Sequence, residues 1–318
     1  HGVVRVLAFG NDLLDYAERR IRSAIRDVPQ GTWTAEEFLE SGGPGTGRIR
    51  IHAKVTIGES GLTADFAGTD RQVPGNVNAP FAVAQSATYY VVRCLTDPDA
   101  PRNAGAYRPV RVRAEEGSLI RPRPPAAVAA GNVETSQRIV DVLFLALAVP
   151  LPDRVPAQSQ GTMNNLTIGA AGRRRFSYYE TIAGGEGALP YRPGMSGVHT
   201  HMTNTRNTPI EALELAAPLR VEEYRLIPRT GGRGMFPGGD GVRRSVRFLE
   251  RSGTASISSE RRVLRPKGLG GGEEGRAGRN LLLRNGRRQK LPAKVTLALR
   301  RNDVVVIETP GGGGWGPR

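Results

Sequence analysis

The spacing of apolar residues changes along this chain, and this change constrains the fold more than any other feature. Between residues 11 and 28, apolar side chains recur every three or four positions, which predicts an amphipathic helix. Residues 136–148 have the same spacing and predict a second helix. Apolar and polar residues alternate at 49–57, and this period of two is typical of a half-buried strand. The first half therefore mixes helices with strands.

Shorter signals complete the first half. Thr34 and Glu37 have the spacing of a capping box, which predicts a short helix through Leu39. Glycines at both ends of residues 58–61 predict a hairpin turn. The apolar residues of 80–95 predict a further helix.

The second half consists of short strand-like segments separated by glycines, and only residues 210–215 look helical. The whole chain is therefore expected to be α+β, with a mixed helix and sheet first half and a mostly antiparallel β second half. We expect two parts, residues 1–155 and residues 156–318. The strands are predicted at residues 176–182, 221–227, 242–248, 255–259, 294–299 and 304–308.

Two glycine clusters invite a phosphate-loop interpretation, at residues 231–241 and 311–314. A phosphate cradle needs a helix that opens directly after its glycines, and neither cluster is followed by a helical pattern. We therefore expect these glycines to form turns with positive φ angles and the chain by itself not to hydrolyse ATP.

The net charge of +15 raises the question of nucleic-acid binding. The arginines are scattered along the chain, and aromatic residues make up only 6% of it, so platforms for base stacking are few. We expect no nucleic-acid partner. An acidic partner subunit or a genomic bias toward arginine explains the charge more simply.

Other bulk features concern the compartment. Cys94 is the only cysteine, which excludes an intramolecular disulfide framework and fits a cytoplasmic location. No run approaches the roughly 18 apolar residues of a membrane span. We expect a cytoplasmic protein without a membrane anchor.

The first polar segment with chemical potential is 130–138, directly before the helix predicted at 136. Backbone N–H groups and the positive end of the helix dipole can bind a carboxylate or phosphate there. Asn132 and Thr135 add polar donors, and Glu134 could act as an acid or base. The alternative is a helix N-cap at Thr135 or Ser136 with a solvated glutamate.

Two further segments offer groups for an amide substrate. Asn164 and Asn165 would point to opposite sides of an extended chain, and each side-chain amide presents both a donor and an acceptor. Turn formation is the alternative explanation for these asparagines. Tyr179 and Glu180 lie in a possible strand and could face a site.

The richest polar segment is 197–208. If it is extended, His199, His201 and Thr203 share one face, and Asn204 lies on the other. Two imidazoles at this spacing can bind one metal ion, but a third ligand is not evident. Polar packing and substrate hydrogen bonding remain alternatives.

Taken together and in order, several segments resemble the hydantoinase B/oxoprolinase family. They cover nearly the whole chain: residues 65–80, 131–141, 160–165, 178–188, 196–209, 238–244, 258–262 and 309–316.

The resemblance implies an ATP-dependent reaction shared by a hetero-oligomer. In this family, a hydantoinase A-type partner subunit with an actin-like nucleotide site activates a carbonyl or bicarbonate as a phosphorylated intermediate. The B-type subunit then completes ring opening or carbon–carbon bond formation. The resemblance also implies a divalent metal whose ligands lie N-terminal to this chain, so the chain corresponds to the C-terminal portion of a B-type subunit.

We therefore expect a hydrolase that opens a cyclic amide of the hydantoin or 5-oxoproline type. A ketone carboxylase subunit and a non-catalytic scaffold half are the alternatives. Glu134 is expected to lie within about 15 Å of His201, the span of an ordinary ligand pocket. The expected catalytic residues are Glu134, Glu180, His199 and His201, and the expected substrate-binding residues are Asn132, Thr135, Asn164, Asn165, Thr203 and Asn204.

Overall fold

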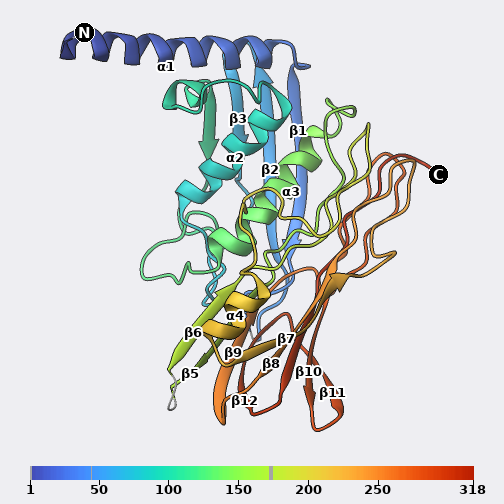
Figure 1. Cartoon of the computed structure of the whole chain (residues 1–318). Helices are drawn as coiled ribbons and strands as arrows, with labels where there is room; N and C mark the ends of the chain where they lie inside the picture. The colour runs from blue at the N-terminus through green and yellow to red at the C-terminus, as the bar shows by residue number, and fades with distance from the viewer. Residues whose placement is uncertain (1, 44, 172–174) are drawn as a thin grey trace. The chain divides into compact units, whose positions relative to one another are not determined.

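A computed structural model describes residues 2–43, 45–171 and 175–318 (Figure 1). The chain divides into two compact units. The first comprises His1–Leu39 and Ile49–Val155, and the second comprises Glu40–Arg48 and Pro156–Arg318. The expected α+β class is confirmed, since the first unit combines helices with a sheet and the second is built mainly from antiparallel strands.

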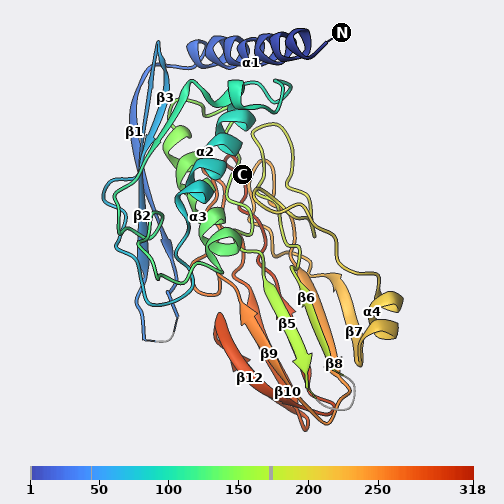
Figure 2. The same ribbon diagram turned by 90° about the vertical axis from the view of Figure 1, so that its left-hand side faces the viewer.

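The first unit is a sheet with helices packed on it (Figure 2). The strand order is β1-β2-β3-β4, with β4 parallel to β3 and the other neighbours antiparallel. Helix α3 lies against β1 and β2, and α2 packs on α3. The elements are α1 (Val3–Arg26), β1 (Gly31–Leu39), β2 (Ile49–Gly58), β3 (Gly61–Asp65), α2 (Phe81–Leu95), β4 (Val110–Arg113) and α3 (Ser136–Leu147).

The short helix predicted from Thr34 and Glu37 is wrong, because these residues lie in β1. Every residue of β1 pairs with a residue of β2, from Gly31 opposite Ile57 to Leu39 opposite Ile49. A ladder of this length satisfies the backbone along the whole segment, whereas a capping box satisfies only a helix end. Tertiary pairing therefore overrides the local signal.

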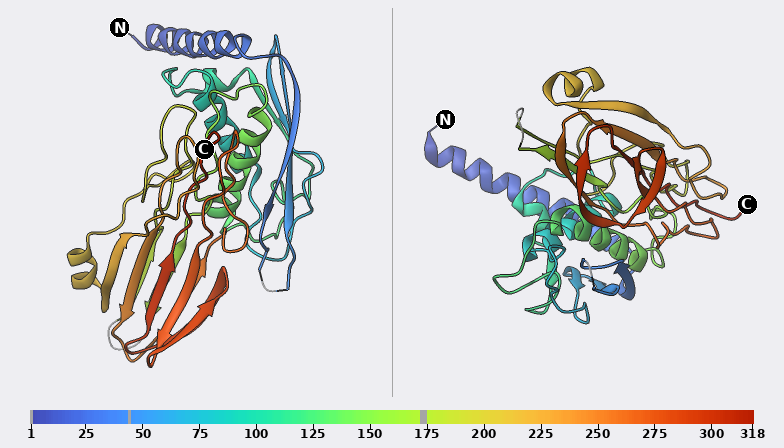
Figure 3. Two further views of the ribbon diagram at one scale, coloured as in Figure 1. Left: turned by 90° about the vertical axis from the view of Figure 1, so that its right-hand side faces the viewer. Right: turned by 90° about the horizontal axis from the view of Figure 1, so that it is seen from below.

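The second unit contains two antiparallel sheets whose strands surround a common interior (Figure 3). Their orders are β11-β10-β13-β8-β7 and β12-β9-β5-β6. Ile168 of β5, Phe248 of β8 and Ile307 of β13 belong to one buried apolar cluster. The elements are β5 (Asn165–Ala170), β6 (Phe176–Glu180), α4 (Ile210–Ala216), β7 (Leu219–Leu226), β8 (Val242–Phe248), β9 (Ser252–Ser258), β10 (Arg279–Arg284), β11 (Arg287–Leu291), β12 (Lys294–Arg300) and β13 (Val304–Glu308).

Extended glycine-rich segments form the rest of this unit's framework. We call them the glycine bundle, made of residues 157–160, 184–188, 194–198, 230–241, 266–276 and 310–316. The last segment is bonded to the others through its backbone. Gly312 N donates to Gly239 O at 2.9 Å, Gly313 N donates to Gln158 O at 2.8 Å, and Gly314 N donates to Glu273 O at 2.9 Å. The bundle therefore replaces side-chain packing with contacts between main chains.

Most glycines of the bundle are required by close backbone approach, and only Gly197, Gly270, Gly271 and Gly316 have positive φ angles. A Cβ on Gly312 would lie 2.0 Å from Glu186 O, and one on Gly311 would lie 2.1 Å from Thr230 O. No glycine of residues 231–241 or 311–314 has a positive φ angle, so the expectation of positive-φ turns is wrong for both clusters. Only glycine allows main chains to approach this closely.

Gly312→Ala is expected to lower the free energy of unfolding by more than about 3 kcal/mol, because its Cβ would meet rigid backbone atoms. Gly47→Ala is the matched control in the same unit, since a Cβ there meets nothing within 4 Å and the residue is exposed. The control should change stability by less than about 0.5 kcal/mol. Urea unfolding of both variants tests this, and equal midpoints would show that the close approach does not exist.

Candidate functional site

The helix predicted from residue 136 is confirmed as α3, and a π-helical turn precedes it. Residues Gly131–Thr135 form a π-helical turn that runs into α3, and neither Thr135 nor Ser136 caps the helix with its side chain. The predicted cap is therefore wrong. The Thr135 hydroxyl instead donates to the carbonyl of Val77. Single π turns inside helices are frequent at functional sites, so residues 131–135 are a candidate part of the site.

Glu134 is fully buried in this turn, which excludes the alternative of a solvated glutamate. Thr135 is also fully buried, whereas Asn132 is exposed. One turn further along α3, the buried Arg138 donates to Asp141 Oδ2 at 2.8 Å. The polar residues at the start of α3 are therefore held inside the first unit.

The asparagine pair lies in the second unit and is bonded to the protein. Asn164 has a φ of 48°, so the chain is not extended there as the alternating-face prediction assumed. Its Oδ1 accepts from Arg262 Nη2 at 2.8 Å. Asn165 begins β5, and its Oδ1 accepts from the Tyr179 hydroxyl at 2.7 Å. Their expected role in substrate binding stays a prediction.

Glu180 is the buried partner of a buried arginine. Arg244 donates to both carboxylate oxygens, at 3.1 and 3.0 Å, and Tyr178 and Asn207 each donate at 2.9 Å. Burial and the nearby Glu180 raise the pKa of Tyr178, so this phenol stays protonated. The Glu180 carboxylate therefore links β6, β8 and the segment at Asn207. The sequence did not predict this positioning role.

The segment with two histidines is not an extended strand. Val198 pairs with Gly184, but His201 has a φ of 59° and Thr203 N donates to Thr200 O at 3.4 Å, which makes a turn. The prediction that His199, His201 and Thr203 share one face of a strand is therefore wrong. Thr203 is buried, and Asn204 is exposed.

The two imidazoles have unusual surroundings. Both ring nitrogens of His199 are buried and form no hydrogen bond with any residue that the structure describes. Burial lowers the pKa of His199, and burial lowers the pKa of His201 to about 4 against a weak opposing effect of Glu186. Both rings are therefore neutral at pH 7 and can accept a proton.

Glu186 is a residue of this region that sequence reasoning missed. Its carboxylate accepts from Arg192 Nη1 at 2.9 Å and Nη2 at 3.0 Å, and from Met195 N at 2.9 Å. It thereby anchors the chain that leads to the histidines. In the sequence, only its position between Gly185 and Gly187 could have indicated this role.

The residues that the structure describes do not form a metal site. Among residues 2–43, 45–171 and 175–318, no group of three or more His, Cys, Asp or Glu side chains could hold an ion. His199 and His201 therefore lack, among these residues, the third ligand that a site would need.

No helix in the described ranges combines the length and apolar character that crossing a lipid bilayer requires.

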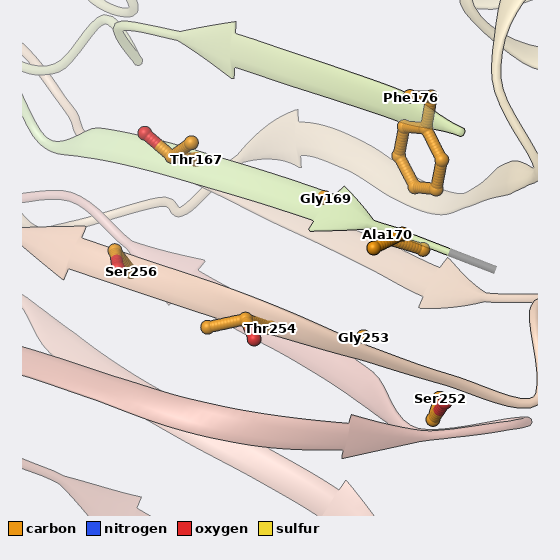
Figure 4. Close-up of a pocket in the computed structure, with 9 residues that line it drawn as sticks. Thr167, Gly169, Ala170, Phe176, Ser252, Gly253, Thr254 and Ser256 are labelled. Carbon is orange, nitrogen blue, oxygen red and sulfur yellow. The ribbon is translucent and has the colours of Figure 1, made fainter.

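A depression of about 740 Å³ lies over β5 and β9 (Figure 4). Its lining is uncharged and mostly small, with Thr167, Thr254 and Ser256 on neighbouring strands and Phe176 as the one large side chain. None of the predicted site residues lines it. The lining therefore contains hydroxyl groups but no carboxylate, imidazole or cation.

The two groups of predicted residues occupy different units. Glu134 belongs to the first unit and His201 to the second, so their expected separation of less than about 15 Å stays a prediction. Within the second unit, segments 160–165, 181–185 and 198–199 are joined by hydrogen bonds. These segments form the candidate site.

Comparison with known proteins agrees with this arrangement of motifs. The family model described as hydantoinase B/oxoprolinase matches residues 1–318. The chain belongs to the hydantoinase B/oxoprolinase family. It is 41% identical over 306 residues to an uncharacterised protein of Methanocaldococcus jannaschii, covering 96% of this chain and 53% of that protein.

Two other members of the comparison carry names that indicate chemistry. A 5-oxoprolinase of Dictyostelium discoideum is 38% identical, with 100% of this chain and 25% of that protein covered. The crystal structure of the ATP-dependent caprolactamase from Pseudomonas jessenii has a TM-score of 0.88 and 26% identity, covering 100% of this chain and 57% of that chain. This hydantoinase B/oxoprolinase chain thus spans between 25% and 57% of the length of these relatives.

The stability of this family member is expected to fall on acidification because of His201. Its pKa is about 4 in the folded chain and 6.5 in the reference state, so between these values only the unfolded chain takes up the proton. The stabilisation is complete above pH 6.5 and is lost as pH falls toward 4. From pH 7 to pH 5 this amounts to roughly 2 kcal/mol.

His201→Asn tests the assignment, because asparagine tolerates a positive φ and does not titrate. Chemical unfolding at pH 7 and pH 5 should show a smaller loss of unfolding free energy for the variant than for the wild type. Equal losses in both proteins would contradict a lowered pKa of His201 in the folded chain.

Proposed function

We propose that this chain is part of a cytoplasmic hydrolase subunit that opens a cyclic amide of the hydantoin or 5-oxoproline type in an ATP-dependent reaction. A hydantoinase A-type partner, as a separate subunit or a fused region, would bind the ATP. The observation that carries this proposal is the match to proteins named 5-oxoprolinase and ATP-dependent caprolactamase. Both names denote action on a lactam, which is a cyclic amide.

The chemistry requires help because an unstrained amide resists hydrolysis. Phosphorylation of the carbonyl oxygen by the ATP-binding partner would supply both the driving force and a leaving group. The B-type subunit would then orient the activated carbon and move protons around it. Neutral imidazoles and side-chain amides serve these purposes, and the candidate site is built from such groups.

Among the predicted catalytic residues, His199 has the surroundings that best suit proton transfer. Its ring nitrogens have no hydrogen-bond partner among the described residues, and burial keeps it neutral. Glu180 is engaged by Arg244, which favours a positioning role. Glu134 and His201 remain proposed catalytic groups, with Asn132, Thr135, Thr203 and Asn204 proposed for substrate binding.

The glycine clusters support the assignment of nucleotide binding to a partner. Residues 311–314 are packed among other main chains, and residues 231–241 lead into strand β8 and not into a helix. A phosphate cradle of the loop-and-helix type is thus not formed by these described segments.

We expect the complete protein, assembled with its ATP-binding partner, to form ADP and the ring-opened product in equal amounts when a cyclic amide is supplied. His199→Gln should lower kcat by about 100-fold or more, because a positioned acid or base contributes at least this factor. Coupled ADP release and product chromatography measure both quantities.

Two results would contradict the proposal. Residues 1–318 alone should not hydrolyse ATP, so ATPase activity that a substitution within this chain abolishes would argue against a partner. Bicarbonate-dependent carboxylation of a ketone, without amide opening, would favour the carboxylase alternative.

A further inference from the structure

Buried polar groups without partners gather on adjoining segments of the second unit. Gln160 Nε2, Thr181 Oγ1 and both ring nitrogens of His199 form no hydrogen bond with any described residue. Gln160 is only 1% exposed and Thr181 only 8%. Buried polar atoms in native proteins are nearly always paired with protein or ordered water, so these atoms on neighbouring segments are available to a bound water or ligand.

Hydrogen bonds show that these segments run beside one another. Gln160 N donates to Gly185 O at 2.8 Å, and Gly184 N donates to Val198 O at 3.1 Å, next to His199. The absence of a side chain at Gly184 makes room for the Gln160 amide, since a Cβ there would lie 2.0 Å from Gln160 Oε1.

A chain of hydrogen bonds fixes which end of the Gln160 amide is free. Arginine can only donate, so the Asn164 atom that faces Arg262 Nη2 at 2.8 Å must be the oxygen Oδ1. Asn164 Nδ2 then donates to Gln160 Oε1 at 2.7 Å and to Ile182 O at 3.1 Å. The unpartnered end of Gln160 is therefore its NH₂ group, a hydrogen-bond donor.

The unpartnered groups are uncharged. They comprise an amide, a hydroxyl and an imidazole whose pKa is lowered by burial. Arg262 donates to Asn164 Oδ1, to the carbonyl of Glu260 and to Asn280 Oδ1. A neutral ligand group with a hydrogen-bond acceptor suits this set better than a phosphate or a carboxylate, which would need a cation.

We propose that Gln160 recognises the substrate carbonyl, its Nε2 donating a hydrogen bond to the oxygen of a neutral cyclic amide group. Asn164 and Arg262 are positioning residues, because their hydrogen bonds hold Gln160 Oε1 and leave Nε2 free to bind the substrate. This inference rests on the proposed function and deepens it, because it names a substrate-contacting residue and the part of the substrate that it binds.

Gln160→Glu in the complete protein with its partner tests the inference, with hydantoin as the probe substrate. The substitution keeps Oε1 for Asn164 and replaces the donor with an acceptor. We expect kcat/KM of the folded variant to fall by about 100-fold, as for the loss of one donor to a reacting carbonyl. Gln160→Met repeats the test without a charge if the glutamate variant does not fold.

Gln158→Glu is the matched control on the same segment. Gln158 Oε1 accepts from Arg261 Nη2 and from Lys267 N, both at 2.9 Å, and a carboxylate keeps both contacts. This variant should retain kcat/KM within about threefold of the wild type, a change under about 1 kcal/mol by the tenfold rule of 1.4 kcal/mol.

Asn164→Asp separates positioning from general stability. It can still accept from Arg262 but cannot donate to Gln160, so the Gln160 amide should turn and present its oxygen. We expect the same loss of kcat/KM as for Gln160→Met, and no further loss when these two changes are combined, whereas independent structural damage would add.

Wild-type kcat/KM in Gln160→Glu, or fully additive losses in the double variant, would overturn the role of Gln160 and leave the proposed function intact. An assembled wild-type protein that opens no cyclic amide would overturn the proposed function, and the ligand named here with it.

Discussion

Close contact between main chains in the glycine bundle is the constraint on which the second unit depends. Residues 310–316 are bonded to neighbouring segments through N–H and C=O groups, and almost no side chain intervenes. The segments held in this way continue directly into the candidate site, at Gln160, Gly184 and Val198. The bundle therefore positions polar groups with backbone precision, which a core of mobile side chains could not match.

Several arginines of the same unit have a structural use in ion pairs with glutamates. On neighbouring strands, Glu308 pairs with Arg279 and Arg243, each at 2.6 Å, and Arg243 also pairs with Glu223. Inside the unit, Arg244 pairs with Glu180 in a fork, where loss of either partner would leave a buried charge. These arginines tie strands together, and such a use needs no nucleic-acid partner.

Most of the secondary structure that the sequence predicts correctly follows from a regular spacing of apolar residues. β2 and α3 were predicted because their apolar residues follow one period over their full length. β5, β10 and β11 were missed, since glycines and charged residues interrupt their patterns, and pairing with distant strands decides them. The Thr34 capping box failed for the same reason. Local sequence patterns do not show whether a segment will pair with a strand that lies elsewhere in the chain.

The site was only partly accessible to sequence reasoning. The motifs around Asn164 and His199 were found, but the roles of Gln160, Glu186 and Arg262 depend on hydrogen bonds between residues as many as 98 positions apart. The glycines were assigned to turns because composition does not distinguish positive φ from close approach. Resemblance to a family located the motifs, and only the three-dimensional contacts show which atoms are used.

Hydrogen–deuterium exchange of the backbone amides tests most directly whether the glycine bundle holds the site in place. The amides of residues 312–314 and Gln160 donate to bundle carbonyls, so they should exchange only with global unfolding, together with the core strands β8 and β13. Exchange of these amides at the rate of exposed loops, while the strands remain protected, would contradict a bundle that positions the site.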